Sequence, residues 1–130
     1  MPKEKVIEKT IEKTIDSSLD QLSDALDSIQ DHVTSISDSE VLPLTLRLLA
    51  EEAITNIMRH GYVGEQGPIE IRSTSSEEDF TIELRDQGAP FDPTAQSETT
   101  GLQLLHAIAD TMEYERKKDM NVLILKKMLS

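Results

Sequence analysis

The chain of 130 residues contains no cysteine, which excludes disulfide bonds and thiolate-bound metals. It has no tryptophan and only two phenylalanines and two tyrosines, so its core must be largely aliphatic. No apolar run approaches the roughly 20 residues needed to cross a bilayer, and the N-terminal segment lacks the apolar stretch of a signal peptide. We therefore expect a cytoplasmic protein that does not act at a membrane.

Basic residues are also scarce, since 13 lysines and arginines stand against 25 acidic residues and the net charge is −12. Such a chain repels nucleic acid phosphates, so we expect no nucleic acid partner. The acidic residues are spread along the chain, which argues against a disordered acidic tail. The length is that of one ordinary domain, and residues 1–130 are predicted to form a single domain.

The N-terminal segment leaves two interpretations open. Its isoleucines recur every fourth residue, a spacing that suits one face of a helix and also one face of a strand. They are Ile7, Ile11 and Ile15. Threonines between them favour an extended conformation, and we interpret residues 5–14 as a strand.

Two helices are predicted next. Apolar residues recur at intervals of three and four over residues 19–33, which predicts an amphipathic helix with a serine N-cap at 17 or 18. A second helix is predicted over residues 42–60. Pro43 is tolerable there because it falls in the first turn, and a glycine ends the helix.

The C-terminal half alternates between strand and helix patterns. Residues 69–75 and 79–86 alternate apolar and polar side chains around a polar turn, which predicts a hairpin. A third helix is predicted over 102–112, and a closing hairpin over 112–127 that turns near 119–121. The order β α α β β α β β indicates an α+β fold: a two-layer sandwich in which a mixed β-sheet carries its helices on one face.

The second predicted helix carries a polar stripe. Glu52, Asn56 and His60 recur every fourth residue and share one face, next to an apolar stripe that can pack on a sheet. Such a helix could bury one flank and present polar groups at the rim of a pocket. The spacing by itself also describes an ordinary solvated face.

Two further stretches could complete a site. In "DQGAPFD", Asp86 ends a predicted strand and Gly88 follows, so a carboxylate could accept a hydrogen bond from a base while the loop backbone approaches the ring. A simple turn also accounts for these residues. In "TTGLQLLHAIAD", Gly101 opens a helix whose first amides could bind an anion. None of these signals is specific by itself.

Together and in this order, the three stretches resemble the GHKL ATPases, the superfamily of histidine-kinase catalytic domains, Hsp90, gyrase B and MutL. "EEAITNIMRHGY" is similar to their N box, "RDQGAPFDP" to the first glycine box, and "TGLQLLHAIADTMEYER" to the second glycine box and the elements after it. Within the superfamily the chain looks most like the small anti-sigma-factor serine/threonine kinases of the RsbW and SpoIIAB kind. The resemblance spans residues 15–128.

This resemblance implies a role for each matching residue. On the N box, Glu52 would be the general base that orients a partner's hydroxyl, and Asn56 would hold the Mg²⁺ that bridges the phosphates of ATP. Phosphoryl transfer depends mainly on position and charge neutralisation, and oxygen ligands of this kind suit Mg²⁺.

The glycine boxes would hold the rest of the nucleotide. By the same resemblance, Asp86 would bind the adenine amino group and Gly88 would let the loop come close. Gly101 and Leu102, at the start of the third helix, would lie by the phosphates. His60 would lie near the triphosphate.

The chain departs from the family's pattern in its second glycine box. Thr99 stands where a glycine is usual, and the loop between Phe91 and Gly101 is short. A short lid supplies fewer phosphate contacts. The departure motivates an alternative to a kinase: a non-catalytic regulatory binding module of the same fold, with weak or no nucleotide binding. A structural α+β domain with a solvated polar stripe is a third possibility.

The resemblance implies an ATP- and Mg²⁺-dependent serine/threonine kinase. Its substrate would be a STAS-domain anti-anti-sigma protein, and it would sequester a sigma factor or a similar regulator in the manner of partner switching. A homodimer is implied by the resemblance alone. The two histidines outside the N box, His32 and His106, lie on predicted helices and are interpreted as surface residues. No spacing supports a metal site.

Overall fold

The structure is a computed structural model that describes residues 8–62, 65–95 and 99–129. Its elements follow one another in the predicted order. They are β1 (Lys9–Asp16), α1 (Leu19–Ile36), α2 (Leu42–Asn56), η1 (Ile57–Gly61), β2 (Pro68–Ser75), β3 (Asp79–Asp86), η2 (Pro93–Ala95), α3 (Thr100–Ile108), β4 (Thr111–Lys117) and β5 (Met120–Met128). Within these parts of the chain, every helix is too short or too polar to cross a bilayer.

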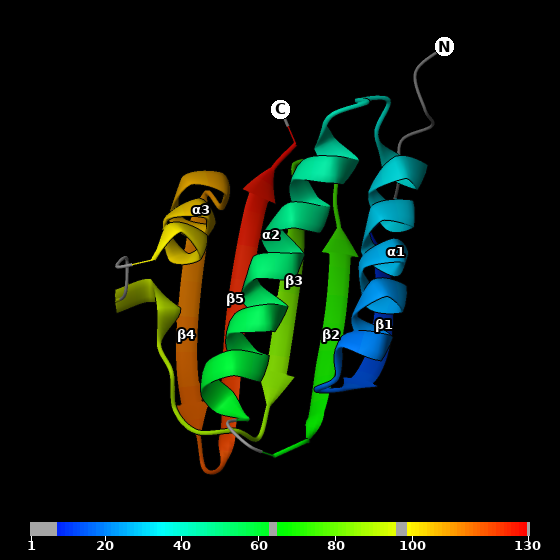
Figure 1. Cartoon of the computed structure of the whole chain (residues 1–130). Helices are drawn as coiled ribbons and strands as arrows, with labels where there is room; N and C mark the ends of the chain where they lie inside the picture. The colour runs from blue at the N-terminus through cyan, green and yellow to red at the C-terminus, as the bar shows by residue number, and fades with distance from the viewer. Residues whose placement is uncertain (1–7, 63–64, 96–98, 130) are drawn as a thin grey trace.

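The five strands form one sheet in the order β1-β2-β3-β5-β4, and the three α-helices cover one face of it (Figure 1). All four strand pairs are antiparallel, so the expectation of a mixed sheet is wrong. Two successive helices return the chain to the end of β1, and β2 therefore starts opposite it, with Asp16 paired to Pro68. After α3 the chain passes the edge of the sheet, and β5 separates β3 from β4, which run in the same direction.

The core lies between the sheet and the helices and is aliphatic, as the composition predicts. Phe80 and Tyr62 are its only aromatic residues among those that the structure describes as buried. Alternate residues of β2 and β3 point into the core, and the solvent-facing positions between them are polar. This period of two explains why both segments were recognisable as strands.

Several predicted boundaries shift. The third helix ends at Ile108 rather than Met112, because Ala109 is extended and the amide of Asp110 donates to the Lys126 carbonyl in the sheet. The last hairpin turns at Lys118, which has a φ of 53°, slightly before the predicted position. The first strand covers residues 9–16; residues 5–7 of the predicted strand lie outside the described part of the chain.

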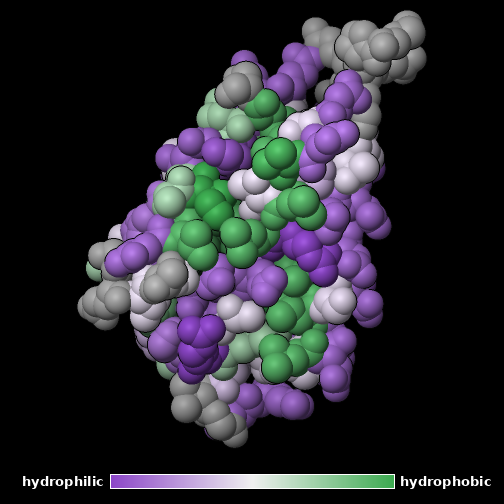
Figure 2. All heavy atoms as spheres, turned by 45° about the horizontal axis from the view of Figure 1, so that its top comes forward, coloured by the Kyte–Doolittle hydropathy of each residue, from purple (hydrophilic) through white to green (hydrophobic). Residues whose placement is uncertain are grey.

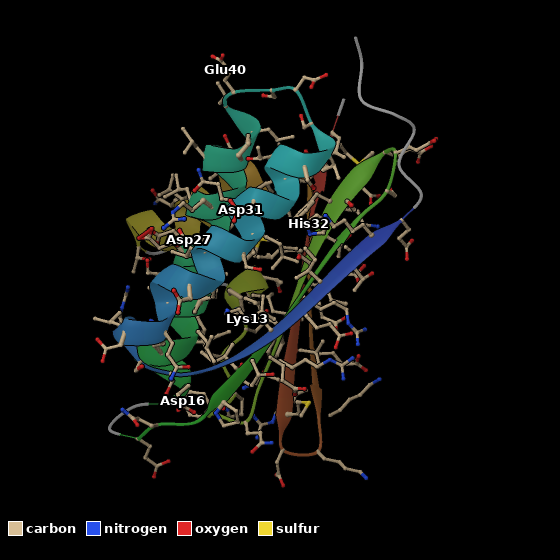
Figure 3. The ribbon with its side chains drawn as sticks, turned by 90° about the vertical axis from the view of Figure 1, so that its right-hand side faces the viewer. Lys13, Asp16, Asp27, Asp31, His32 and Glu40 are labelled. Atoms are coloured by element: carbon tan, nitrogen blue, oxygen red, sulfur yellow. The ribbon has the colours of Figure 1, made fainter. Side chains whose placement is uncertain are left out.

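His32 is not a surface residue, and that prediction is wrong. Its side chain is 1% exposed and lies on the side of α1 that meets the sheet, whereas Asp27 and Asp31 lie on the outer side (Figure 3). Nδ1 is 2.9 Å from Ser73 Oγ and Nε2 is 3.0 Å from Ser75 Oγ. Burial, with the nearby charge of Lys9, lowers the pKa of His32 to about 4. His106 is exposed, as predicted.

Candidate functional site

A pocket lies where the C-terminal end of α2, the end of β3, the second half of α3 and the β4–β5 hairpin meet. Its cavity volume is about 20 Å³, and the space rises to about 360 Å³ when the open solvent at its mouth is counted. Its lining is mostly apolar, with three polar side chains and one tyrosine hydroxyl set into it. The lining residues are Ala53, Asn56, Ile57, Gly61, Asp86, Ala89, Phe91, Pro93, Leu105, Tyr114, Asn121 and Leu123. An apolar cavity with a few convergent polar groups is typical of a site for a small ligand.

Asp86, the last residue of β3, places a carboxylate in this pocket. The side chain is buried, and its Oδ1 accepts hydrogen bonds from the Gly88 amide at 2.9 Å and from Asn121 Nδ2 at 2.9 Å. No described residue donates to Oδ2. One oxygen of Asp86 is therefore held by the protein, while the other can accept a hydrogen bond from a ligand.

Gly88 is required by a close approach of two backbone segments. A Cβ at this position would lie 2.5 Å from the Gly61 carbonyl oxygen and 2.8 Å from its Cα. The next amide, of Ala89, donates to the same carbonyl at 2.8 Å. The loop after β3 is thus seated directly on the end of the helical segment that carries the N-box stripe, which holds Asp86 close to that stripe.

The β4–β5 hairpin supplies site residues that the sequence reasoning missed. Asn121 Nδ2 donates to Asp86 and also to the carbonyls of Gly88 and Ala89, at 3.2 and 3.0 Å. Its Oδ1 accepts from the Tyr114 hydroxyl and from Arg116. Asn121 stands on the same face of β5 as buried Leu123 and Leu125, and a polar residue in that alternation was the available signal.

Asn56, at the C-terminal end of α2, lines the pocket with an amide that is 3% exposed. Its Nδ2 has no hydrogen-bond partner, alone among the buried side-chain atoms that the structure describes. A buried amide without a partner costs free energy, commonly about 1–3 kcal/mol. Such an atom at the wall of a cavity is satisfied when a ligand occupies the cavity.

Glu52 lies one turn before Asn56 and faces the start of α3. A Cβ built on Gly101 would overlap Glu52 Oε2, so the carboxylate rests against the first turn of α3. The side chain is half-buried. The structure therefore brings together the carboxylate of the N box and the glycine of the second glycine box, which lie 49 positions apart in the sequence.

The predicted helix over 42–60 is not an α-helix throughout. After Asn56 it widens into the π-helical turn η1, in which the Tyr62 amide donates to the Ile57 carbonyl at 3.2 Å. π-helical turns occur frequently at functional sites. His60 lies on this turn and stacks on Phe91, with ring centroids 4.3 Å apart and an interplanar angle of 12°. Phe91 lines the pocket, so His60 contacts its wall from behind this ring without lining the pocket itself.

Thr99 caps α3, so the residue that replaces the usual glycine has a structural role. Its side-chain oxygen accepts a hydrogen bond from the Leu102 amide at 3.1 Å. The Leu102 side chain is buried in the core. Leu102 could therefore contribute to anion binding only through its backbone, and only by giving up the cap. Residues 96–98 of the predicted lid lie outside the described part of the chain.

The site fits a metal only if a ligand supplies part of its coordination. Among the described residues, no group of three or more His, Cys, Asp or Glu side chains could hold a metal ion. One buried amide with a carboxylate a turn away is, however, a set of oxygen ligands that suits Mg²⁺ shared with phosphate oxygens. The unpartnered atom of Asn56 is its amide nitrogen, a hydrogen-bond donor that suits a phosphate oxygen, and only Oδ1 of this side chain could ligate Mg²⁺.

Comparison with known proteins agrees with this geometry. A model of the histidine kinase-like ATPase domain matches residues 15–127, nearly the whole chain. The chain belongs to the histidine kinase-like ATPase family. The resemblance to the GHKL superfamily that the three motifs indicate is thereby confirmed.

Two relatives of this family member are informative. The serine/threonine-protein kinase BtrW of Bordetella bronchiseptica is 29% identical over 98 residues, an alignment that covers 65% of this chain and 69% of BtrW. The histidine kinase AdeS of Acinetobacter baumannii shares the fold, with a TM-score of 0.54 over 92% of this chain and 68% of AdeS. The sequence identity to AdeS is 12%, so that likeness shows the fold alone.

The predicted site residues are brought to one region of this ATPase-family fold. Asn56 and Asp86 line the pocket, and Gly88 seats the loop that forms part of its wall. Gly101 lies against Glu52, and His60 stacks on Phe91, which lines the pocket. The roles of these residues, and of Leu102, toward a nucleotide stay predictions.

Proposed function

We propose that this protein is an ATP- and Mg²⁺-dependent serine/threonine kinase that phosphorylates a STAS-domain anti-anti-sigma protein. The observation that carries the proposal is the position of Glu52 against Gly101, beside a pocket that contains Asp86 and the unpartnered amide of Asn56. The relative BtrW is named a serine/threonine-protein kinase, which supports a protein substrate.

The apolar pocket accepts the adenine ring in this proposal. Asp86 takes a hydrogen bond from the adenine amino group through Oδ2, since Oδ1 is already bonded within the protein. Gly88 packs closely on Gly61, which keeps the backbone of the loop out of the space that the adenine ring would occupy. Apolar groups at Ala53, Ile57 and Leu123 exclude water around the base.

Transfer takes place between α2 and the start of α3. Asn56 would hold Mg²⁺ through its Oδ1, and the bound ion would neutralise charge on the phosphates. The hydroxyl oxygen of the substrate's serine or threonine forms a bond to the γ-phosphorus, and the bond from that phosphorus to the bridging oxygen of ADP breaks. The hydroxyl proton passes to the carboxylate of Glu52, which is half-buried and therefore reachable from the surface.

The same surface is proposed to sequester a sigma factor or a similar regulator in competition with the STAS-domain protein. Both partners would then share one docking region, and phosphorylation of the first would release it. The motifs' resemblance to anti-sigma-factor kinases supports this partner choice.

The test is transfer of labelled γ-phosphate from ATP to STAS-domain proteins of the same organism. We expect phosphoserine or phosphothreonine on one of them, and no transfer without Mg²⁺. If a STAS-domain protein binds to the chain with ATP and Mg²⁺ present but receives no phosphate, the kinase proposal fails.

One observation favours a second candidate, a non-catalytic binding module of the same fold. Thr99 occupies the Leu102 amide that could otherwise contact a phosphate. Calorimetry with Mg-ATP separates the two candidates. Micromolar binding that is lost in Asp86→Asn supports the kinase, whereas no measurable binding together with tight partner binding supports the module.

A further inference from the structure

Three apolar side chains on the outer face of α2 remain exposed to solvent. They are Val41 at the N-cap, Leu44 and Leu48, with relative exposures of 68%, 58% and 38%. We refer to these three residues as the α2 patch. Figure 2, which brings this end of the molecule forward, shows hydrophobic side chains gathered on the helical face among hydrophilic ones. Large apolar side chains that cluster in the open commonly mark a protein interaction site.

The α2 patch lies on the same helix as Glu52, the proposed proton acceptor, and on the same side of it. Leu44, Leu48 and Glu52 recur every fourth residue and therefore lie along one face of the helix. At a rise of about 1.5 Å per residue, Leu48 is about 6 Å and Leu44 about 12 Å from Glu52 along the helix axis. A protein seated on the patch would have its nearest surface groups within reach of that carboxylate.

The surroundings of the patch are acidic. Asp38 and Glu40 lie exposed in the segment before α2, and Glu51 lies one turn beyond Leu48. The basic residue of α2, Arg47, is turned toward α1, where it donates to Asp27 at 2.8 Å. The charge that remains around the patch is therefore negative.

We propose that the α2 patch is the docking surface for the phosphoacceptor protein. Its occupant presents apolar side chains flanked by lysine or arginine, and the serine or threonine to be phosphorylated lies beside them and reaches Glu52. Apolar contact supplies affinity, and charge complementarity supplies orientation and a faster encounter. The inference deepens the proposed kinase function and rests on it.

The charge pattern argues against a second copy of the chain as the occupant. Two copies that met through this face would bring acidic rims together in a protein of net charge −12. Three side chains also fall far short of the roughly 20–30 residues on each side of a stable interface. A substrate protein, which must leave after each turnover, is better served by a small patch.

The first experiment removes the apolar surface. In the double variant Leu44→Ser/Leu48→Ser, we expect the KM for the STAS-domain substrate to rise about tenfold or more. The kcat and the KM for ATP should stay at wild-type values, because neither leucine lines the nucleotide pocket. The matched control is Leu19→Ser, which removes an even more exposed leucine from the first turn of α1 and should leave all three parameters unchanged.

The second experiment reverses charge at the rim. Glu40→Lys should raise the KM for the same substrate severalfold at low salt, and the difference from wild type should shrink as salt screens the charge. An increase in KM of equal size at all salt concentrations contradicts the basic character assigned to the occupant.

The outcomes separate the two proposals. Absence of transfer by the wild type removes the kinase function and this inference with it. Normal transfer by the wild type with an unchanged KM in the double variant removes the inference alone. A wild-type dimer that becomes a monomer in the double variant, measured by light scattering, assigns the patch to self-association and also overturns the inference.

Discussion

Two neighbouring helices each bury one polar side chain, and the two environments differ. His32 on α1 has both ring nitrogens bonded to serines of β2, in a region closed by packing between helix and sheet. Asn56 on α2 is almost as deeply buried but leaves Nδ2 without a partner at the wall of a pocket. The hydrogen bonds of the His32 ring are all made within the chain, whereas the Asn56 amide nitrogen needs a partner from outside the chain.

This difference distinguishes a buried polar side chain that stabilises the fold from one that belongs to a binding site. Burial alone does not identify a site, because His32 is more deeply buried than Asn56 and has the strongly shifted pKa. The distinguishing feature is whether the chain itself satisfies the buried atom. Each prediction below perturbs one of these two regions and asks whether the change is felt in stability or in binding and turnover.

The largest effect is expected from Glu52→Gln on the pocket side. Loss of the proton acceptor should lower the rate of phosphate transfer by about 100-fold or more. The Kd for Mg-ATP and the melting temperature should change little, because the isosteric side chain keeps its place against Gly101. Rapid-quench assays measure the rate. A rate within threefold of wild type, taken as roughly the noise of such assays, would contradict the role of a general base.

The matched pair His32→Ala and Asn56→Ala sharpens the comparison. His32→Ala should lower the free energy of unfolding by about 2–4 kcal/mol, because it leaves a cavity and removes the hydrogen bonds of the ring to Ser73 and Ser75. Asn56→Ala removes an unsatisfied atom, so stability without nucleotide should stay within about 1 kcal/mol of wild type, while Mg-ATP binding is lost. Urea titration and calorimetry measure the two quantities. Equal destabilisation by both variants would remove the distinction.

Acidification should destabilise the protein through His32, and it should do so at a higher pH than titration of an ordinary carboxylate. The folded-state pKa of His32 is about 4, whereas in the unfolded chain it is about 6.5. The unfolded state therefore binds a proton first, and stability falls as the pH drops from about 6.5 to about 4, by up to about 3 kcal/mol. Unfolding in urea at several pH values measures this slope, and His32→Gln should reduce it.

The smallest effect is expected from the hairpin that supports the pocket. Asn121→Ala removes one of the two hydrogen bonds that hold Asp86 Oδ1 and should weaken ATP binding about tenfold. Tyr114→Phe, which removes only a bond to the other end of Asn121, should weaken binding less. Titration with a fluorescent ATP analogue compares them. A larger loss in the tyrosine variant would show that the hairpin acts through packing instead.

The order of elements and the grouping of the motif residues were predictable because both are encoded locally. Apolar periodicity identified the helices and strands, and the N box places Glu52 and Asn56 on one helix. The position of His32 was not predictable in this way. Its burial depends on hydrogen bonds between its ring and Ser73 and Ser75, which lie more than 40 residues away in the sequence.

Local sequence patterns also did not predict the directions of the strands or the hydrogen bond from Asn121 to Asp86. Whether a sheet is mixed depends on which strands become neighbours, and here β5 inserts between the two strands that run in the same direction. Asn121 was interpreted as part of a turn, because the register of β5 against β3 that pairs it with Asp86 is set by tertiary contact.

The number of residues in the π-helical turn η1 determines where Gly61 lies in the site. Its five residues occupy the place of a tighter α-turn and deliver Gly61 to the position where Gly88 packs on it. Deleting one residue there would restore ordinary helical winding and swing Gly61 around the axis by about 100°. The loop after β3 would then lose its seat although every motif side chain were still present. Counting residues across this turn is consequently as informative as matching letters when one asks whether a similar chain can build the same pocket.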